Sequence, residues 1–166
     1  MISKKIASVI TSVMVFCCIV GVSLTNVKAD DSAPKSVDGS YLTSADSSTG
    51  YTPKNNERGK HLMDGQCSIS KTGTKRIYAY GSTTANHTVD AVAVIVYVDR
   101  YHESDGKWHQ IDAFSKKVEN DYYVATSKSI QVDRGYYYRV HASHIVRMAG
   151  SPDEETCSFT DGILVP

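Results

Sequence analysis

The stretch VDAVAVIVYVDRY, residues 89–101, decides the fold of this chain. Its even positions from 92 to 98 are all valine and share one face of a strand, because successive side chains of a strand point to opposite faces. Ala93, Ile95 and Tyr97 lie on the other face, which is therefore also apolar. A strand that is apolar on both faces is usually central in its sheet and partly covered on each side. We therefore expect residues 89–101 to form a central strand.

A hairpin is predicted directly after this strand. Asp105-Gly106 separates residues 89–101 from a second alternating run, Trp108–Val118. Asp-Gly between two such runs is the strongest short-range signal of a tight turn. With a two-residue turn, His102 would lie opposite His109 across the hairpin.

The remaining sequence contains further short runs rich in Val, Ile, Tyr and Thr, divided by Gly, Asp, Asn and Ser. No stretch has apolar residues sustained at helical spacing. Seven short strands separated by turn residues indicate an all-β fold, an antiparallel β-sandwich of the immunoglobulin or fibronectin type III kind. The predicted strands are residues 66–71, 75–81, 89–101, 108–118, 122–132, 136–147 and 156–165.

The stretch IQVDRGYYYRVHA, residues 130–142, resembles the corner before the penultimate strand of fibronectin type III and immunoglobulin-like domains. In that register Tyr136 and Tyr138 point inward, and we expect one inward tyrosine to bond its hydroxyl to a backbone carbonyl of the preceding loop. Tyr137, Arg139 and His141 then point outward. The resemblance concerns architecture, and nothing about function follows from it.

The chain is predicted to have three parts. Residues 1–29 have the basic start, apolar run and small residues before a cut that define a cleavable secretory signal peptide. A membrane anchor is the alternative, but the apolar run is short and interrupted by polar residues. Residues 30–59 are a flexible leader rich in Ser, Thr and Asp, and residues 60–166 form the β-sandwich domain. We expect no stable membrane span after cleavage.

Cleavage changes both the charge and the cysteine content. Without residues 1–29 the chain has 15 basic and 18 acidic residues and is mildly acidic, whereas a nucleic-acid binder would carry a basic face. Cys67 and Cys157 remain, and in an oxidising compartment such a pair most simply forms a disulfide. Two free thiols, or a metal pair with further ligands, are the alternatives. We expect the disulfide and no nucleic-acid partner.

The sequence offers no assembled set of catalytic or metal-binding residues. His102 and His109 are a weak candidate metal pair, because a structural zinc site needs four ligands and no third ligand is spaced to join them. The chain has no Gly-x-Ser-x-Gly nucleophile elbow. Asp99 and Asp112 could face each other across the hairpin, but like charges directly opposite each other are destabilising. We therefore expect no enzyme activity, no metal and no cofactor.

Aromatic residues are the most suggestive feature of the sequence. The chain has 11 tyrosines, one tryptophan and three phenylalanines, mostly on predicted strands. Exposed aromatic side chains on a rigid sheet can stack on sugar rings or anchor in protein pockets, although tyrosine also simply suits β-strands. The candidate binding residues on one exposed sheet face or its hairpin rim are Tyr97, Tyr101, Trp108, Phe114, Tyr137, Arg139 and His141.

A wider resemblance runs from about residue 41 to the end of the chain. The segments that carry it are YLTS (41–44), RG (58–59), LMDG (62–65), SIS (68–70), GSTTAN (81–86), GYYYRV (135–140) and TDGI (160–163). With them the chain resembles a family of small exported proteins of Firmicutes known only as a domain of unknown function. The resemblance implies a Gram-positive source and an extracellular location, and it supplies no catalytic or binding residues.

Together these features predict a secreted, non-catalytic binding module that uses an aromatic and polar sheet face in the extracellular space or at the cell envelope. Its partner would be a glycan, a peptide or a protein. The alternative is a bacteriocin-like toxin or its protective partner, because compact exported sandwiches also occur in that class. A small hydrolase with a dispersed site is the more remote alternative.

Overall fold

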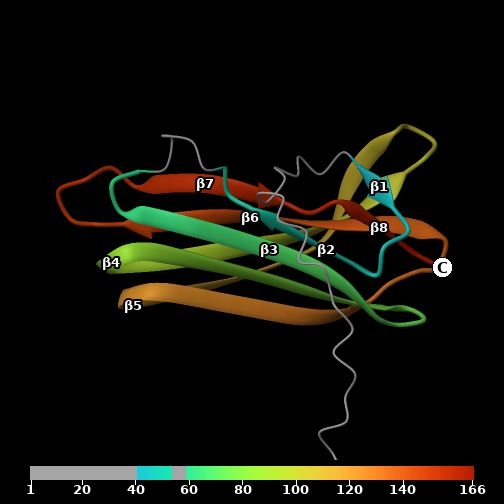
Figure 1. Ribbon diagram of the computed structural model, residues 1–166, viewed down its shortest axis with the longest axis horizontal. Coiled ribbons are helices and arrows are strands. Elements are labelled where there is room, and N and C mark those ends of the chain that lie inside the picture. The colour runs from blue at the N-terminus through green and yellow to red at the C-terminus, as the bar shows by residue number, and fades with distance from the viewer. Residues whose placement is uncertain (1–40, 54–58) are drawn as a thin grey trace, which may run out of the picture. The chain divides into compact units, whose positions relative to one another are not determined.

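The computed structural model describes residues 41–53 and 59–166, which form a sheet of eight β-strands (Figure 1). In chain order the strands are β1 Leu42–Thr43, β2 Ser47–Tyr51, β3 Leu62–Gly73, β4 Arg76–His102, β5 Lys107–Gln131, β6 Tyr136–Arg147, β7 Glu154–Phe159 and β8 Gly162–Val165. The expected all-β fold is confirmed. Within the described ranges no helix is long and apolar enough to span a membrane. The expected signal peptide, residues 1–29, lies outside them.

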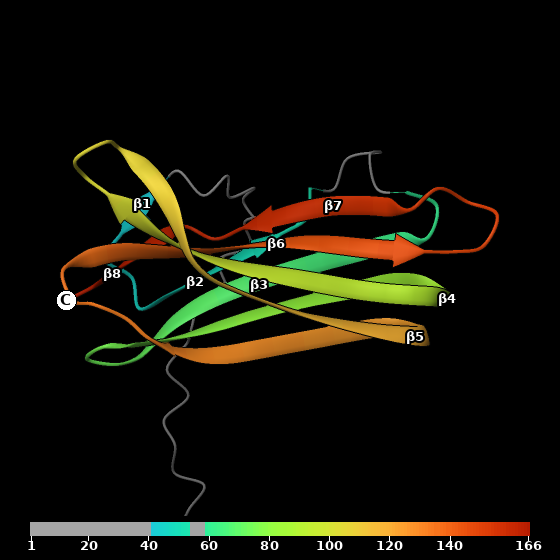
Figure 2. The same cartoon turned by 180° about the vertical axis from the view of Figure 1, so that it is seen from behind.

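Two long strands hold the sheet together. β4 has 27 residues and β5 has 25, and they pair antiparallel along most of their length. The first part of β4, residues 76–85, also pairs with β3, whereas residues 91–100 pair with β6. The β4–β5 ladder is interrupted between Thr84 and Val89, and Asn120 near this interruption has a φ of 55°. The sheet curls so that its two halves face each other (Figures 1 and 2).

The core lies between the two facing halves. The valines at positions 92, 94, 96 and 98, predicted to share one face of a central strand, are all fully buried. Cys67, Ile69, Ile77 and Ala79, from β3 and the start of β4, belong to the same buried cluster. The central position of residues 89–101 follows from this, because they pair with β5 on one side and β6 on the other.

The fold differs from the predicted sandwich in its connectivity. The strands form one sheet in the order β1-β8-β6-β4-β3-β2, with β5 paired to β4 and β7 paired to β6. β1 and β8 run parallel, so the sheet is mixed rather than purely antiparallel. The predicted strands 75–81 and 89–101 are one strand, and so are 108–118 and 122–132, where β5 continues across Asn120.

Part of the expected flexible leader is ordered in the sheet. β2 pairs with β3, and β1 pairs with β8. The Thr52 hydroxyl donates to Asp64 Oδ1 at 2.9 Å and accepts a hydrogen bond from the Gly65 amide at 3.1 Å. These contacts hold β2 and Thr52 against β3 although the segment is polar.

The predicted tyrosine hydroxyl bond before β6 is present. Tyr138 is 1% exposed, and its hydroxyl donates to the Asp133 backbone oxygen at 2.9 Å. Tyr136, also expected to point inward, is instead 42% exposed, and the Arg100 guanidinium lies 4.8 Å from its ring centroid. The inward alternation of β6 therefore begins at Tyr138.

Both thiols in the described residues are free, contrary to the expected disulfide. Cys67 on β3 points into the core, where its thiol lies 3.7 Å from the Val140 backbone oxygen. Cys157 on β7 is partly exposed and lies opposite Ser143, with 3.9 Å between Sγ and Oγ. Along β7 Cys157 alternates with the buried Ser158, so its side chain lies on the face of the strand away from the core that holds Cys67. Burial raises the pKa of Cys67 to about 12.

A neutral histidine is buried between the two halves of the sheet. His144 Nδ1 lies 3.0 Å from Thr83 Oγ1, and its Nε2 lies 2.8 Å from Ser158 Oγ. Because the Thr83 hydroxyl donates to the Ala93 backbone oxygen, it accepts the proton of Nδ1, and Nε2 accepts from Ser158. Burial lowers the pKa of His144 to about 4. Gly65 makes room for the ring, since a β-carbon there would lie 2.3 Å from His144 Cγ.

Candidate functional site

An aromatic and charged surface lies on the outer side of β4, β6 and β7 and includes Trp108 at the start of β5. In the register of β4 and β6, Tyr97 lies opposite His141. Asp99 lies opposite Arg139 in the same pair of strands, and on β7 Phe159 lies opposite His141. These residues alternate with the buried ones, so they share the outer face. We define the aromatic face as Tyr97, Tyr101, Trp108, Arg139, His141 and Phe159.

Three rings of the aromatic face form a stacked row across three strands. The Tyr97 and His141 ring centroids are 4.6 Å apart with 12° between the ring planes. His141 and Phe159 follow at 5.6 Å and 18°. The planes of neighbouring rings thus face each other, and the His141 imidazole is covered on both faces.

A buried carboxylate lies under this row. Asp99 is 4% exposed, and its Oδ2 accepts hydrogen bonds from Arg139 Nε at 2.9 Å and from His141 Nδ1 at 3.1 Å. Burial by itself raises the pKa of Asp99, but the hydrogen bonds from His141 and Arg139 outweigh it and lower the pKa below its ordinary value. The carboxylate therefore stays ionised and fixes the orientation of both partners.

A second row of the aromatic face leads toward the hairpin loop. The Arg139 guanidinium lies 4.5 Å from the Trp108 ring centroid, and Trp108 meets Tyr101 at 5.2 Å. The Cη2 and Cζ2 edge of the indole lies against Gly162, where a β-carbon would lie only 2.5 Å from the ring. Trp108 is thus in contact with both Arg139 and β8.

The structure brings together five of the seven predicted binding residues and places the other two, Tyr137 and Phe114, elsewhere. Tyr97, Tyr101, Trp108, Arg139 and His141 are in contact on the aromatic face. Tyr137 does not join these stacks. It lines an adjoining groove of about 460 Å³ together with Arg100, Tyr101, His102, Glu103, Ser104, Arg134, Gly135 and Tyr136.

Phe114 lies on the opposite face from the one expected. It pairs with Val96 and packs partly buried against the core. A bulge explains the difference: Asp112 pairs with Val98 while Gln110 pairs with Asp99, so one extra residue reverses the alternation of β5 between Trp108 and Phe114. The same bulge separates Asp99 from Asp112, which binds Lys128 at 2.8 Å instead.

The two hairpin histidines are neighbours, although their predicted register was wrong. The loop has four residues, Glu103 to Gly106, so His102 pairs with Lys107 instead of His109. The His102 and His109 ring centroids are still only 4.1 Å apart. His109 Nε2 bonds to Asp105 at 2.7 Å, and His102 Nε2 accepts from Arg100 Nε at 3.2 Å. Within the described residues no group of three His, Cys, Asp or Glu side chains could hold a metal ion.

Sequence reasoning missed Phe159 as a member of the aromatic face and Asp99 as the buried carboxylate beneath it. Alternation places Asp99 on the same face as Tyr97, and an outward Arg139 on a neighbouring strand could have suggested its partner. No signal in the sequence fixes which strand lies beside β6, so the place of Phe159 next to His141 could not be predicted.

Fold and surface together define a small all-β protein with one curled sheet and an ordered aromatic face. The family model described as "Family of unknown function (DUF6147)" matches residues 28–161, and the chain belongs to this family. The resemblance to a family of unknown function is thereby confirmed. No curated protein matches the chain.

Proposed function

We propose that the chain is an exported binding module, extracellular or held at the cell envelope, that recognises a peptide or protein through the aromatic face. Export rests on the signal-peptide pattern of residues 1–29. Binding rests on one observation: aromatic and charged side chains of neighbouring strands form a contiguous surface around one buried carboxylate. Fixed aromatic and arginine side chains supply much of the binding energy in protein interfaces. Binding at this face needs no catalytic step.

The stacking favours a peptide or protein ligand over a sugar. A sugar ring would bind against an open aromatic face, but both faces of His141 are covered by Tyr97 and Phe159. One face of the Trp108 indole is covered by the Arg139 guanidinium, and the edge of the indole lies against Gly162. Ring edges and polar groups are left to face a partner, and these suit the amides and side chains of a polypeptide.

The groove beside Tyr101 extends the aromatic face, and its charged residues indicate which charge a ligand would carry. Arg134 Nε donates to the Pro166 backbone oxygen at 2.7 Å, which fixes this arginine at the groove wall. Arg100 lies over Tyr136 and bonds to His102. Glu103 also lines the groove, and Arg100 pairs with the exposed Asp133 at 3.4 Å. A ligand carboxylate, such as an acidic side chain or a peptide C-terminus, would bind at the two guanidinium groups in place of this exposed pair.

The test is a comparison of peptide and glycan arrays probed with the purified chain and a variant pair. We expect binding to acidic peptides, and a loss of about tenfold or more in the double variant His141→Ala, Phe159→Ala. Tyr122→Ala is the matched control, because Tyr122 is 55% exposed but lies outside the aromatic face. It should bind as the unchanged chain does.

Two results would count against this proposal. One is peptide binding that is equal in the double variant and the control, which would place the ligand elsewhere. The other is glycan binding without peptide binding. Inhibition of the growth of related bacteria by the purified chain would favour the toxin alternative instead.

A further inference from the structure

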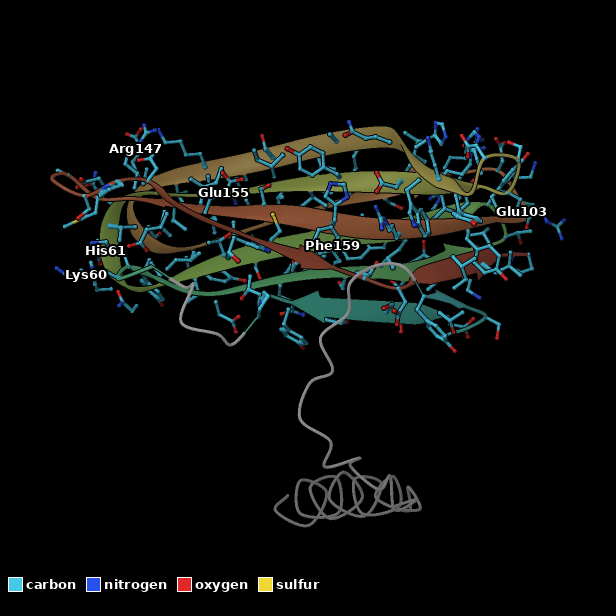
Figure 3. All side chains as sticks on the ribbon, turned by 90° about the horizontal axis from the view of Figure 1, so that it is seen from above. Lys60, His61, Glu103, Arg147, Glu155 and Phe159 are labelled. Carbon is cyan, nitrogen blue, oxygen red and sulfur yellow. The ribbon has the colours of Figure 1, made fainter. Side chains whose placement is uncertain are left out.

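A second cluster of polar side chains lies at the end of the sheet remote from the β4–β5 hairpin loop. Figure 3 shows Lys60, His61 and Arg147 at this end and Glu103 of the hairpin loop at the other, with Phe159 between them. The cluster joins three segments that are distant in sequence: the start of β3, residues 86–88 in β4, and the loop between β6 and β7.

Three side chains of this cluster form a continuous hydrogen-bonded chain. His61 Nε2 lies 3.3 Å from Ser151 Oγ, and His61 Nδ1 lies 2.9 Å from His87 Nε2. His87 Nδ1 in turn lies 2.7 Å from the backbone oxygen of Thr88. We call Ser151, His61 and His87 the serine relay.

The Thr88 carbonyl fixes the direction of every hydrogen bond in the serine relay. A carbonyl oxygen only accepts, so His87 Nδ1 carries the proton and His87 Nε2 of the neutral ring is an acceptor. His61 Nδ1 therefore donates to His87, and His61 Nε2 of the neutral ring has a free lone pair. The Ser151 hydroxyl donates to that lone pair. A histidine placed in this way is a general base for the serine, and a third group orients it.

The backbone around His61 is fixed from both sides. The Glu154 carboxylate accepts the amide of His61 at 2.8 Å and that of Leu62 at 2.7 Å. The Asn86 amide donates to the His61 backbone oxygen at 2.9 Å, and Asn86 Nδ2 donates to the Lys60 backbone oxygen at 2.7 Å. The base is thus held in place before any ligand arrives, as an efficient catalytic group requires.

In the serine relay the base is buried and the serine is partly exposed, which is the arrangement that nucleophilic catalysis needs. His61 is 6% exposed, whereas Ser151 is partly exposed. Ser151 sits in a turn in which its amide donates to the Met148 backbone oxygen at 3.0 Å and Gly150 has a φ of 79°. The turn presents the hydroxyl at the surface while the base beneath it is shielded from water.

We propose that Ser151 is a nucleophile that takes up the acyl group of carboxylic esters, with His61 as its general base and His87 as a positioning residue. This inference goes beyond binding, because it adds a covalent step at a site apart from the aromatic face. An ester is the substrate class, because a neutral histidine can deprotonate serine and then protonate an alkoxide leaving group. The partly exposed hydroxyl suits small esters or acyl groups on the surface of a larger molecule.

The step balances with water as the second reactant. Ser151 Oγ forms a bond to the ester carbonyl carbon while its proton passes to His61 Nε2, and the carbonyl electron pair moves onto oxygen. That pair returns, the carbon–alkoxide bond breaks, and the alcohol leaves with the proton from His61. Water then attacks the acyl-serine by the same route, with His61 as base, and releases a carboxylic acid and free Ser151.

The experiment treats the purified chain with p-nitrophenyl acetate, follows nitrophenolate release and maps the acetyl group by mass spectrometry. We expect one acetyl group on Ser151 and a fall of about 100-fold in rate for Ser151→Ala. Ser129→Ala, at an exposed position of β5, is the matched control and should react like the unchanged chain. Circular dichroism establishes that each variant is folded.

The positioning role of His87 is tested by a rescue. His87→Ala should lower the acetylation rate by about tenfold, because His61 loses the acceptor that orients it. His87→Gln should restore most of the rate, since its Oε1 can accept from His61 Nδ1. Nitrophenolate release by the unchanged chain that is no faster than that of Ser151→Ala, or an acetyl group on another residue, would overturn the proposal. Peptide binding at the aromatic face would be unaffected by any of these outcomes.

Discussion

The aromatic face and the serine relay are both centred on a histidine, and they differ in what that histidine is bonded to. His141 donates to the buried carboxylate of Asp99, which also holds Arg139, and aromatic rings cover both of its faces. His61 has neutral partners at both ring nitrogens, and one nitrogen is directed at a hydroxyl. The hydrogen-bond partners of each histidine therefore determine what that histidine can do. A carboxylate and stacked rings make a fixed recognition surface, whereas a neutral acceptor leaves a lone pair for proton transfer.

The two regions also differ in how the chain assembles them. The aromatic face comes from residues paired in register on adjacent strands, so it follows from strand pairing alone. The serine relay needs the start of β3, the middle of β4 and the β6–β7 loop to meet. Changes that act on the sheet as a whole should affect both regions, and local changes should separate them.

Acidification should lower the free energy of unfolding more than any other change considered. It should affect both regions together, because His144 lies between the halves of the sheet. Folding lowers its pKa from 6.5 to about 4, so the unfolded chain takes up the proton first as the pH falls. The contribution of His144 to the free energy of unfolding is complete above about pH 6.5 and is lost toward about pH 4, a change of about 3 kcal/mol. Urea unfolding at several pH values, with the His144 ring followed by NMR, measures it. A ring that titrates at its ordinary pKa in the folded chain would contradict this expectation.

Asp99→Asn should disturb the aromatic face and spare the serine relay. The change removes the negative charge that holds Arg139 and His141, and we expect a loss of about 2 kcal/mol in the free energy of unfolding together with weaker peptide binding. Asp112→Asn is the matched control, because its ion pair with Lys128 is partly exposed and should cost less than about 1 kcal/mol. Equal losses in the free energy of unfolding would show that the Asp99 contacts stabilise the fold no more than the Asp112–Lys128 ion pair does.

Glu154→Gln should lower the free energy of unfolding least of these changes. Unlike Asp99→Asn, it should affect the serine relay and spare the aromatic face. The amide side chain keeps one acceptor for the His61 and Leu62 backbone but loses the charge, which should cost about 1 kcal/mol. Acetylation of Ser151 should slow, since the backbone under His61 loosens, while peptide binding stays as before. Parallel loss of peptide binding and acetylation would mean that the two regions are not independent.

Much of the fold could be predicted because alternation is a local property. The valines of residues 92–98 and the outward Tyr97 followed from period two alone, and Tyr138 followed from the corner pattern. Phe114 was placed on the wrong face, because a bulge reverses the alternation and nothing in the local composition marks it. The continuity of β4 through polar residues 82–88 was missed for a related reason: residues 82–85 are paired with β3, and nothing in the local composition marks that pairing.

The two candidate sites also differ in how far they could be predicted from the sequence. Five members of the aromatic face were predicted, because they lie on strands whose outward positions can be counted from the sequence. The serine relay was not predicted. His61 precedes His87 by 26 residues and Ser151 by 90, and no spacing rule connects positions so far apart.

The length of β4 and β5 has a consequence for how the chain folds and unfolds. The same two strands run through both halves of the sheet, and a loop of four residues joins them. Pairing can begin beside that loop and extend along the ladder, so the longest ladder of the sheet forms with little loop-closure entropy. Neither half can then melt without opening strands on which the other half depends. We expect a single cooperative unit in which an event at one end is felt at the other through the shared backbone ladder.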